Sequence, residues 1–158
     1  MKFDFKKLFI SLLLPQLTGL VGSFWTAPAI TLWYGTLNKP SFSPPNSIFA
    51  PVWITLYLMI GLSLYLVWQK IDLKPRKVKL ALKIFWVHLI LNGLWSIIFF
   101  GGNNILWGLY TIIALWLLIL TLIIIFWKIS KPASLLLVPY FLWVSFATIL
   151  NYSLLILN

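Results

Sequence analysis

Residues 105–127 read ILWGLYTIIALWLLILTLIIIFW, without a single charged side chain. A helix needs about 20 predominantly apolar residues to cross the hydrocarbon core of a bilayer, and this stretch is long enough. Because lipid offers no hydrogen-bonding partners, the backbone of such a segment must pair within itself, which favours a helix over an open strand. The stretch therefore predicts a transmembrane helix.

Four further uncharged runs of similar length flank it, at 8–25, 48–68, 84–100 and 133–157. A transmembrane β-barrel would need shorter segments of alternating polarity. The first run follows Lys6 and Lys7 as a signal peptide would, but it lacks a small-residue cleavage site, so we expect it to stay in the protein. We predict an all-α integral membrane protein, one domain over 1–158, with five transmembrane helices at about 5–25, 47–68, 80–101, 104–127 and 133–157.

The composition agrees with a chain that is solvated by lipid. It is 62% hydrophobic and 9% charged, against about 45–50% apolar and about 25% charged in soluble domains. The net charge of +10 does not indicate nucleic-acid binding, because the basic residues lie between apolar runs rather than along a polar face. The absence of cysteine excludes disulfides and thiolate chemistry.

The basic residues are distributed very unequally over the two predicted sides of the membrane. One side holds eleven of them: Lys2, Lys6 and Lys7, then Lys70, Lys74, Arg76, Lys77, Lys79 and Lys83, then Lys128 and Lys131. The other side holds only Lys39. By the positive-inside rule the N-terminus is cytoplasmic and the C-terminus lies outside, and we expect a bacterial cell membrane.

The predicted connection at 26–46 is too long and too rich in rigid residues to be a simple linker. We expect an ordered lid on the outer face, because prolines reduce the entropy lost on ordering and aromatic side chains need a surface to pack on. The residues that suggest this lid are Trp33, Tyr34, Pro40, Phe42, Pro44 and Pro45.

Ordinary catalytic groups are missing from the predicted spans. The only acidic residues are Asp4 and Asp72, both outside them, and the only histidine is His88. A carboxylate pair, a Ser-His-Asp triad and a metal site with three protein ligands are therefore excluded, and we expect neither a metal nor a required cofactor. We interpret His88 as a hydrogen-bonding partner between helices.

Apart from Trp33 in the expected lid, the ten tryptophans divide by depth in the membrane. Five lie near helix ends, where an interfacial aromatic belt accounts for them: Trp25, Trp68, Trp86, Trp107 and Trp127. Trp53, Trp95, Trp116 and Trp143 lie deeper, where an indole N–H requires a partner. Helical spacing places several aromatic and neutral polar residues on shared faces in the outer half of the membrane.

These residues predict an aromatic-lined cavity beneath the lid, suited to a flat apolar ligand. The candidate binding residues are Trp53, Tyr57, Asn92, Trp95, Ser96, Phe99, Trp107, Tyr110, Trp143, Ala147 and Leu150. An interlocked aromatic core without a cavity remains the alternative. In the first span Gly19 and Ser23, four residues apart, allow a close helix–helix approach, within the monomer or across a dimer.

Several of these motifs occur together in a known family. They are Trp33-Tyr34, Lys39-Pro40, Phe42 and Pro44-Pro45; Pro51-Val52-Trp53 and Leu56-Tyr57; Leu91-Asn92, Trp95 and Phe99-Phe100-Gly101; and Pro139-Tyr140, Trp143, Phe146-Ala147-Thr148 and Leu150-Asn151-Tyr152. With Pro15 and the Gly19, Val21-Gly22-Ser23 pattern, the chain resembles the translocator protein (TspO) family, also called the tryptophan-rich sensory or peripheral benzodiazepine receptor family, over nearly its whole length.

This resemblance implies a five-helix bundle, often a homodimer, with a pocket near Trp53 and Trp143 that the first loop closes. It implies binding of protoporphyrin IX and related tetrapyrroles, and of isoquinoline carboxamides. Eukaryotic relatives bind cholesterol through a Leu-x-Tyr-x-Arg/Lys pattern, of which Leu150 and Tyr152 are present here without the basic residue. The sequence thus does not support cholesterol binding, and its uncharged C-terminal end is typical of a bacterial member.

Three functions are compatible with this resemblance. The first is a receptor or sensor that binds porphyrins, which the residues support best. The second is a porphyrin transporter. The third is an enzyme that degrades porphyrin with light and oxygen, in which Trp53 and Trp143 would act as electron donors, because no conventional catalytic group is present.

The charge asymmetry predicts the orientation of the chain directly. Alkaline phosphatase fused after Asn158 should be active, because this enzyme folds only outside the cytoplasm, whereas a fusion in the connection near Asp72 should be inactive. The reverse pattern of activity would contradict an N-terminus on the cytoplasmic side.

Overall fold

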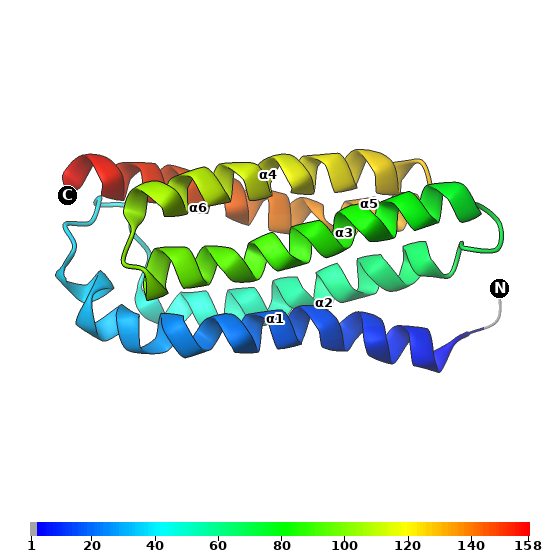
Figure 1. Cartoon of the computed structure of the whole chain (residues 1–158), viewed down its shortest axis with the longest axis horizontal. Coiled ribbons are helices and arrows are strands. Elements are labelled where there is room, and N and C mark those ends of the chain that lie inside the picture. Colours follow the sequence, from blue (N-terminus) through cyan, green and yellow to red (C-terminus); the bar gives the residue numbers. More distant parts are fainter. Residues whose placement is uncertain (1–2) are drawn as a thin grey trace.

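The computed structural model describes residues 3–158, and within that range it contains helices and no strands (Figure 1). The elements are α1 (Phe5–Leu32), η1 (Tyr34–Thr36), η2 (Asn46–Ile48), α2 (Phe49–Trp68), α3 (Pro75–Ser96), the π-helical turn η3 (Ile97–Gly101), α4 (Ile105–Trp127), α5 (Lys131–Leu136) and α6 (Val138–Leu157). Five helical segments are long and apolar enough to span a membrane, which confirms the predicted fold class.

Three helix boundaries differ from those predicted. Helix α1 continues to Leu32 rather than ending at 25, so the first part of the expected lid is helical even though it contains Pro28. Helix α3 begins at Pro75 rather than at 80, because proline has no N–H to leave unpaired in a first helical turn. The last span is divided at Leu137, because Pro139 cannot donate the hydrogen bond that a continuous helix would require.

The spans run up and down along one common direction, and the described chain begins and ends at opposite ends of the bundle (Figure 1). Helix α1 packs on α2 and α3, while α4 packs on α3 and α6. The α2–α3 connection and the turn between α4 and α5 lie at the same end of the bundle as the start of α1, so the structure gathers the basic segments at that end. Lys2 lies outside the described residues.

A polar side chain caps the N-terminus of a helix at each end of the bundle. The backbone N–H of Lys7 donates to Asp4 Oδ1 at 3.0 Å, and this bond is the main cause that holds the pKa of Asp4 below its usual value. At the other end, Asn104 caps α4 by accepting from the backbone N–H of Trp107 at 3.0 Å. Asn103 supplies the positive φ of 49° that the turn before α4 requires.

The half of the bundle that contains the chain's first helical turns is tightly packed. Fully buried side chains interlock there between α2, α4 and α5, among them Ile60, Val67, Ile119, Leu122 and Ala133. Ser63 donates to the backbone oxygen of Ala133 at 2.6 Å and ties α2 to α5. Since lipid is as apolar as these side chains, close packing and internal hydrogen bonds must hold the helices together.

The backbone of helix α1 lies directly against α2 where α2 has a glycine. A Cβ atom built at Gly61 would lie 2.6 Å from the backbone oxygen of Ser11 and 2.9 Å from the Cα of Leu12. Neither atom can move without shifting the backbone of α1. Gly61 therefore permits this close backbone contact between α1 and α2.

The variant Gly61→Ala should lower the stability of the detergent-solubilised protein by about 1–3 kcal/mol, the usual cost of overpacking. Gly93→Ala is the matched control, because its added methyl group would meet only the Cγ2 atom of Thr18, at 3.3 Å, which can rotate away. Thermal unfolding followed by circular dichroism would compare the two. Equal melting temperatures for both variants would show that the Gly61 contact is not limiting.

Candidate functional site

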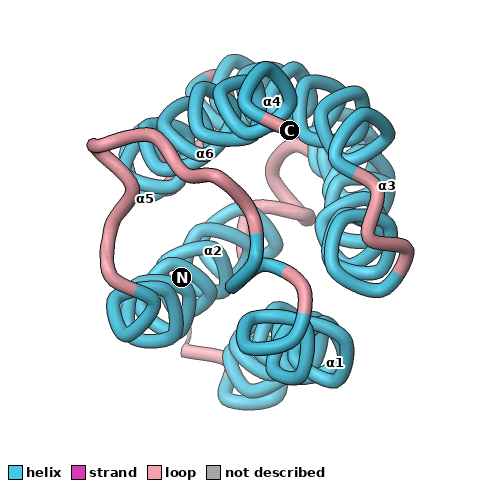
Figure 2. Tube along the Cα trace, turned by 90° about the vertical axis from the view of Figure 1, so that its left-hand side faces the viewer, coloured by secondary structure: helices cyan, strands magenta, loops and turns pink. Residues whose placement is uncertain are grey.

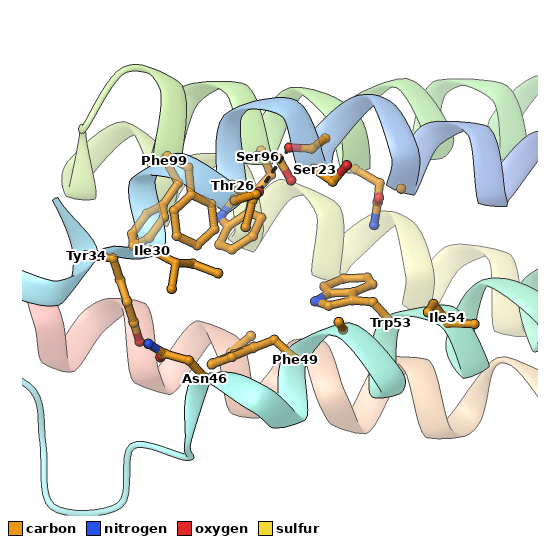
Figure 3. A pocket seen from close by; sticks show the side chains of 18 of the residues that line it. Ser23, Thr26, Ile30, Tyr34, Asn46, Phe49, Trp53, Ile54, Ser96 and Phe99 are labelled. Carbon is orange, nitrogen blue, oxygen red and sulfur yellow. Dashed lines mark hydrogen bonds between the residues drawn. The ribbon is translucent and has the colours of Figure 1, made fainter. Parts of the chain in front are cut away.

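A cavity of about 440 Å³ lies in the half of the bundle that contains the C-terminal part of α6 (Figure 3). Segments α1, α2, α3, η3 and α6 all contribute to its walls, and η1 and η2 contribute at its outer end. The predicted site residues that line it are Trp53, Tyr57, Asn92, Trp95, Ser96, Phe99, Ala147 and Leu150. The alternative of a solid aromatic core does not describe this half of the molecule.

Aromatic rings form two opposed parts of the cavity wall. On α2 the indole of Trp53 lies 5.3 Å from the ring of Tyr57, between ring centroids, and presents a broad apolar face. On the other side Trp95 stacks on Phe99 with centroids 5.2 Å apart and an interplanar angle of 12°. Figure 3 shows Trp53 and Phe49 on one side of the cavity and Phe99 on the other. This geometry suits a planar ligand.

Hydrogen-bonded polar residues form the inner end of the cavity. The Tyr57 hydroxyl donates to Asn92 Oδ1 at 2.8 Å, and Asn92 Nδ2 donates to the Tyr140 hydroxyl at 2.8 Å. The Tyr140 hydroxyl in turn lies 3.0 Å from His88 Nε2. Residues Tyr57 and Asn92 line the cavity, whereas His88 and Tyr140 are fully buried behind them. The interpretation of His88 as a partner between helices is confirmed.

Other polar atoms along the cavity have no partner within the described part of the chain. They are the Tyr34 hydroxyl, Trp95 Nε1 and both side-chain atoms of Asn151. A buried polar group without a hydrogen bond costs about 1–3 kcal/mol. The three residues come from η1, α3 and α6, so unused hydrogen-bonding capacity surrounds the outer part of the cavity.

Helix α1 forms a wall of the cavity that the sequence did not predict. Its lining residues are Gln16, Gly19, Leu20, Gly22, Ser23, Thr26, Ala27 and Ile30. Gly19 lies directly against the ring of Tyr57, and a Cβ atom at Gly22 would lie 3.0 Å from Ser96 Oγ. The spacing of Gly19 and Ser23 predicted a close approach, and the structure shows one within the monomer at Gly19 and Gly22, whereas Ser23 is exposed.

The cavity is open to the side, between α1 and α2. Leu20 on α1 and Ile54 on α2 both line it, yet they are 57% and 55% exposed, so they lie at its margin. Ser23 and Ala27 are lining residues that are also exposed. Gln16 Nε2 donates to the Ile54 backbone oxygen at 3.2 Å and bridges the two helices at the inner end of this opening. The opening faces the region that lipid chains occupy.

Two predicted site residues on α4 lie elsewhere. Trp107 is 62% exposed and Tyr110 is 55% exposed, and they pack on each other on the outer surface of the bundle. The inward positions in this part of α4 are Gly108 and Thr111, with Gly108 packed against Phe99. These two aromatic residues lie in the same half of the bundle as the cavity, as expected, but they point away from it.

Trp143 also lies outside the cavity lining. Its ring packs against Phe49 at a centroid distance of 6.1 Å and against Phe146 at 5.7 Å. Phe49 lines the cavity, so Trp143 supports the wall from behind.

The lid is shorter than predicted and covers the end of the bundle. Of its predicted residues only Tyr34 lines the cavity, and its side chain extends toward Asn46 (Figure 3). Trp33 packs on Phe99, and Phe42 packs on Phe146. Pro40, Pro44 and Pro45 belong to the segment between η1 and η2 and do not line the cavity.

Hydrogen bonds attach the middle of this segment to the end of α6. The backbone N–H of Asn38 donates to Asn158 Oδ1 at 2.9 Å, and Asn158 Nδ2 donates back to the Asn38 oxygen at 3.0 Å. Viewed along the bundle in Figure 2, the segment passes across the ends of the helices. The structure thus supports the expectation of an ordered loop with defined contacts.

Fold and cavity together define a five-span α-helical membrane protein with an aromatic-lined cavity that is open to the bilayer. Residues 11–157 match the model of the TspO/MBR family, and the chain belongs to this family. It is 43% identical over 152 residues to the tryptophan-rich protein TspO of Archaeoglobus fulgidus, covering 96% of this chain and 97% of that protein.

Two further relatives extend the comparison. The tryptophan-rich protein TspO of Chlorobaculum tepidum is 43% identical over 144 residues, covering 89% of this chain and 88% of that protein. The translocator protein of Homo sapiens is 35% identical over 140 residues, covering 89% of this chain and 83% of that protein. The resemblance inferred from the motifs is confirmed over nearly the whole chain.

The cavity can be tested without any ligand, because the chain contains no cysteine. Ser96→Cys should react with methyl methanethiosulfonate in folded protein, since Ser96 lines the cavity. Ser63→Cys should stay protected until the protein is denatured, because Ser63 has no exposed surface. Mass spectrometry would measure both reactions, and equal labelling of the two variants would contradict a local cavity.

Proposed function

We propose that this protein is a membrane receptor or sensor that binds porphyrins such as protoporphyrin IX, and related flat apolar ligands, in the cavity between α1, α2, α3 and α6. The observation that carries the proposal is the indole of Trp53, which forms part of the wall of a cavity of about 440 Å³. This volume falls within the range of about 300–1,000 Å³ that is usual for small-molecule sites.

The distribution of polar atoms supports an amphipathic ligand. Trp95 Nε1 and the Tyr34 hydroxyl are donors without partners, at the part of the cavity formed by α3, η1 and η3. They suit carboxylate or carbonyl oxygens at the edge of a ligand whose apolar body lies on Trp53. A protoporphyrin has this chemistry, with a flat aromatic macrocycle and carboxylate groups along one edge.

The sideways opening supports a ligand that dissolves in the bilayer. A molecule in the lipid chains can reach the opening between Leu20 and Ile54 without first crossing water. Binding needs no ion or proton coupling, and the spans contain no carboxylate to provide it. Binding is thus the function for which the residues of the site suffice.

We place the protein in a bacterial cell membrane with the basic end of the bundle in the cytoplasm. The support is the concentration of basic residues at the end where α1 begins, which anionic lipid on the cytoplasmic side would stabilise. In this orientation the cavity opens toward the outer leaflet.

Loss of the Trp53 ring tests the proposed function. Trp53→Ala should weaken protoporphyrin IX binding by about ten-fold or more, since stacking of an aromatic ligand is worth about 1–3 kcal/mol per contact by analogy with nucleobases. Fluorescence titration of the protein in nanodiscs, with empty nanodiscs as the blank, would measure the affinity.

The matched control is Trp127→Ala, which removes an indole that is 49% exposed at the end of α4 far from the cavity. It should leave the affinity within about two-fold of the wild type. Equal losses in both variants would indicate general destabilisation, and unchanged affinity in Trp53→Ala would remove the support for binding in this cavity.

A further inference from the structure

The hydrogen bonds behind the cavity form one continuous chain that has a direction. It runs from Tyr57 on α2 through Asn92 on α3 to Tyr140 on α6 and ends on His88 of α3. Each hydroxyl group has a single hydrogen to donate. Whether the group at one end donates or accepts therefore determines which groups donate and which accept along the whole series. Tyr57 and Asn92 meet the cavity, whereas the other two residues are fully buried.

The direction can be followed atom by atom. Tyr140 accepts from Asn92 Nδ2, so its own hydrogen is free to go to His88 Nε2, which lies 3.0 Å from the Tyr140 hydroxyl oxygen. His88 must then carry its proton on Nδ1, an atom with no hydrogen-bond partner among the described residues. With Nδ2 turned toward Tyr140, the amide of Asn92 offers Oδ1 to Tyr57, whose hydrogen is used in that bond.

We propose that His88 and Tyr140 are positioning residues for ligand selection: they fix the direction of this chain, and thereby make the Tyr57 oxygen a hydrogen-bond acceptor at the inner end of the cavity. The ligand class that this favours is a flat apolar molecule with an N–H or O–H donor at its inner end. The inference rests on the proposed function, because it describes what the same cavity recognises.

The reverse direction has a defined consequence that makes the proposal testable. If His88 cannot accept, the Tyr140 hydrogen turns to Asn92, and the amide rotates so that Oδ1 faces Tyr140 and Nδ2 faces Tyr57. Tyr57 then accepts from Asn92, and its hydrogen becomes free for a ligand. Removing a residue that touches no ligand should thus change the preferred ligand from donor to acceptor.

Carbazole and dibenzofuran are suitable probes, because they are flat tricyclic molecules of nearly equal size that differ in an N–H group against an ether oxygen. Equilibrium dialysis against protein in nanodiscs, with empty nanodiscs subtracted, gives a dissociation constant for each. The wild type should prefer carbazole by about three- to ten-fold, the usual value of one hydrogen bond. His88→Leu should reverse the preference, so that dibenzofuran binds more tightly.

Tyr65→Phe is the matched control, because it removes the hydroxyl of another buried tyrosine on α2. This hydroxyl accepts from Gln69 and takes no part in the hydrogen bonds between Tyr57 and His88. Its preference should equal that of the wild type. The same preference in His88→Leu as in the wild type would overturn the proposal, and so would probes that bind no more strongly than to empty nanodiscs. Protoporphyrin IX, titrated on the same samples, tests the proposed function separately.

A measurement on the unaltered protein covers the case in which His88→Leu does not fold. The chain contains one histidine, so ¹⁵N-histidine labelling gives the ring nitrogens of His88 alone. The nitrogen chemical shifts should show a proton-bearing Nδ1 and a bare Nε2 in the ligand-free protein. A proton on Nε2 would mean that the hydrogen bonds from His88 to Tyr57 run in the opposite direction, and would overturn the proposal.

Discussion

The hydrogen bonds that join Tyr57, Asn92, Tyr140 and His88 link three membrane-spanning helices at a depth where lipid could not satisfy the same groups. Because lipid does not drive helices together by the hydrophobic effect, such internal bonds and close contacts have to define how the spans sit. The bonds fix α2, α3 and α6 relative to one another, and the cavity lies directly beside them. The position of the site therefore depends on this polar cluster.

Helix α1 completes the site in a different way. It touches α2 closely at Gly61, and it carries Gly19 and Gly22 where Tyr57 and Ser96 approach its backbone. Near its other end it presents mainly small residues, which leave space rather than fill it. The same helix thus anchors the bundle at one end and provides both a wall and a margin of the cavity at the other.

The sequence predicted the spans well because an uncharged run long enough to cross a bilayer has few alternatives. It also placed the site residues along the length of their helices for the same reason, but it did not give the direction of each side chain around its helix. Trp107 and Tyr110 lie in the expected half of the bundle but on the outer side of α4. The contribution of α1 was missed because glycine, serine and alanine give no aromatic signal. Helix α1 also continues past Pro28, although a proline inside a helix usually ends or kinks it.

Binding of a flat ligand inside the bundle, against Trp53 and between α1 and α2, can be seen in a structure of the protein with protoporphyrin IX bound, determined by crystallography or by electron microscopy in nanodiscs. We expect ligand density on the Trp53 face, with the macrocycle edge toward Trp95 and Tyr34. Density only on the outer surface of the helices, for example beside Trp107 and Tyr110, with an empty cavity, would contradict it.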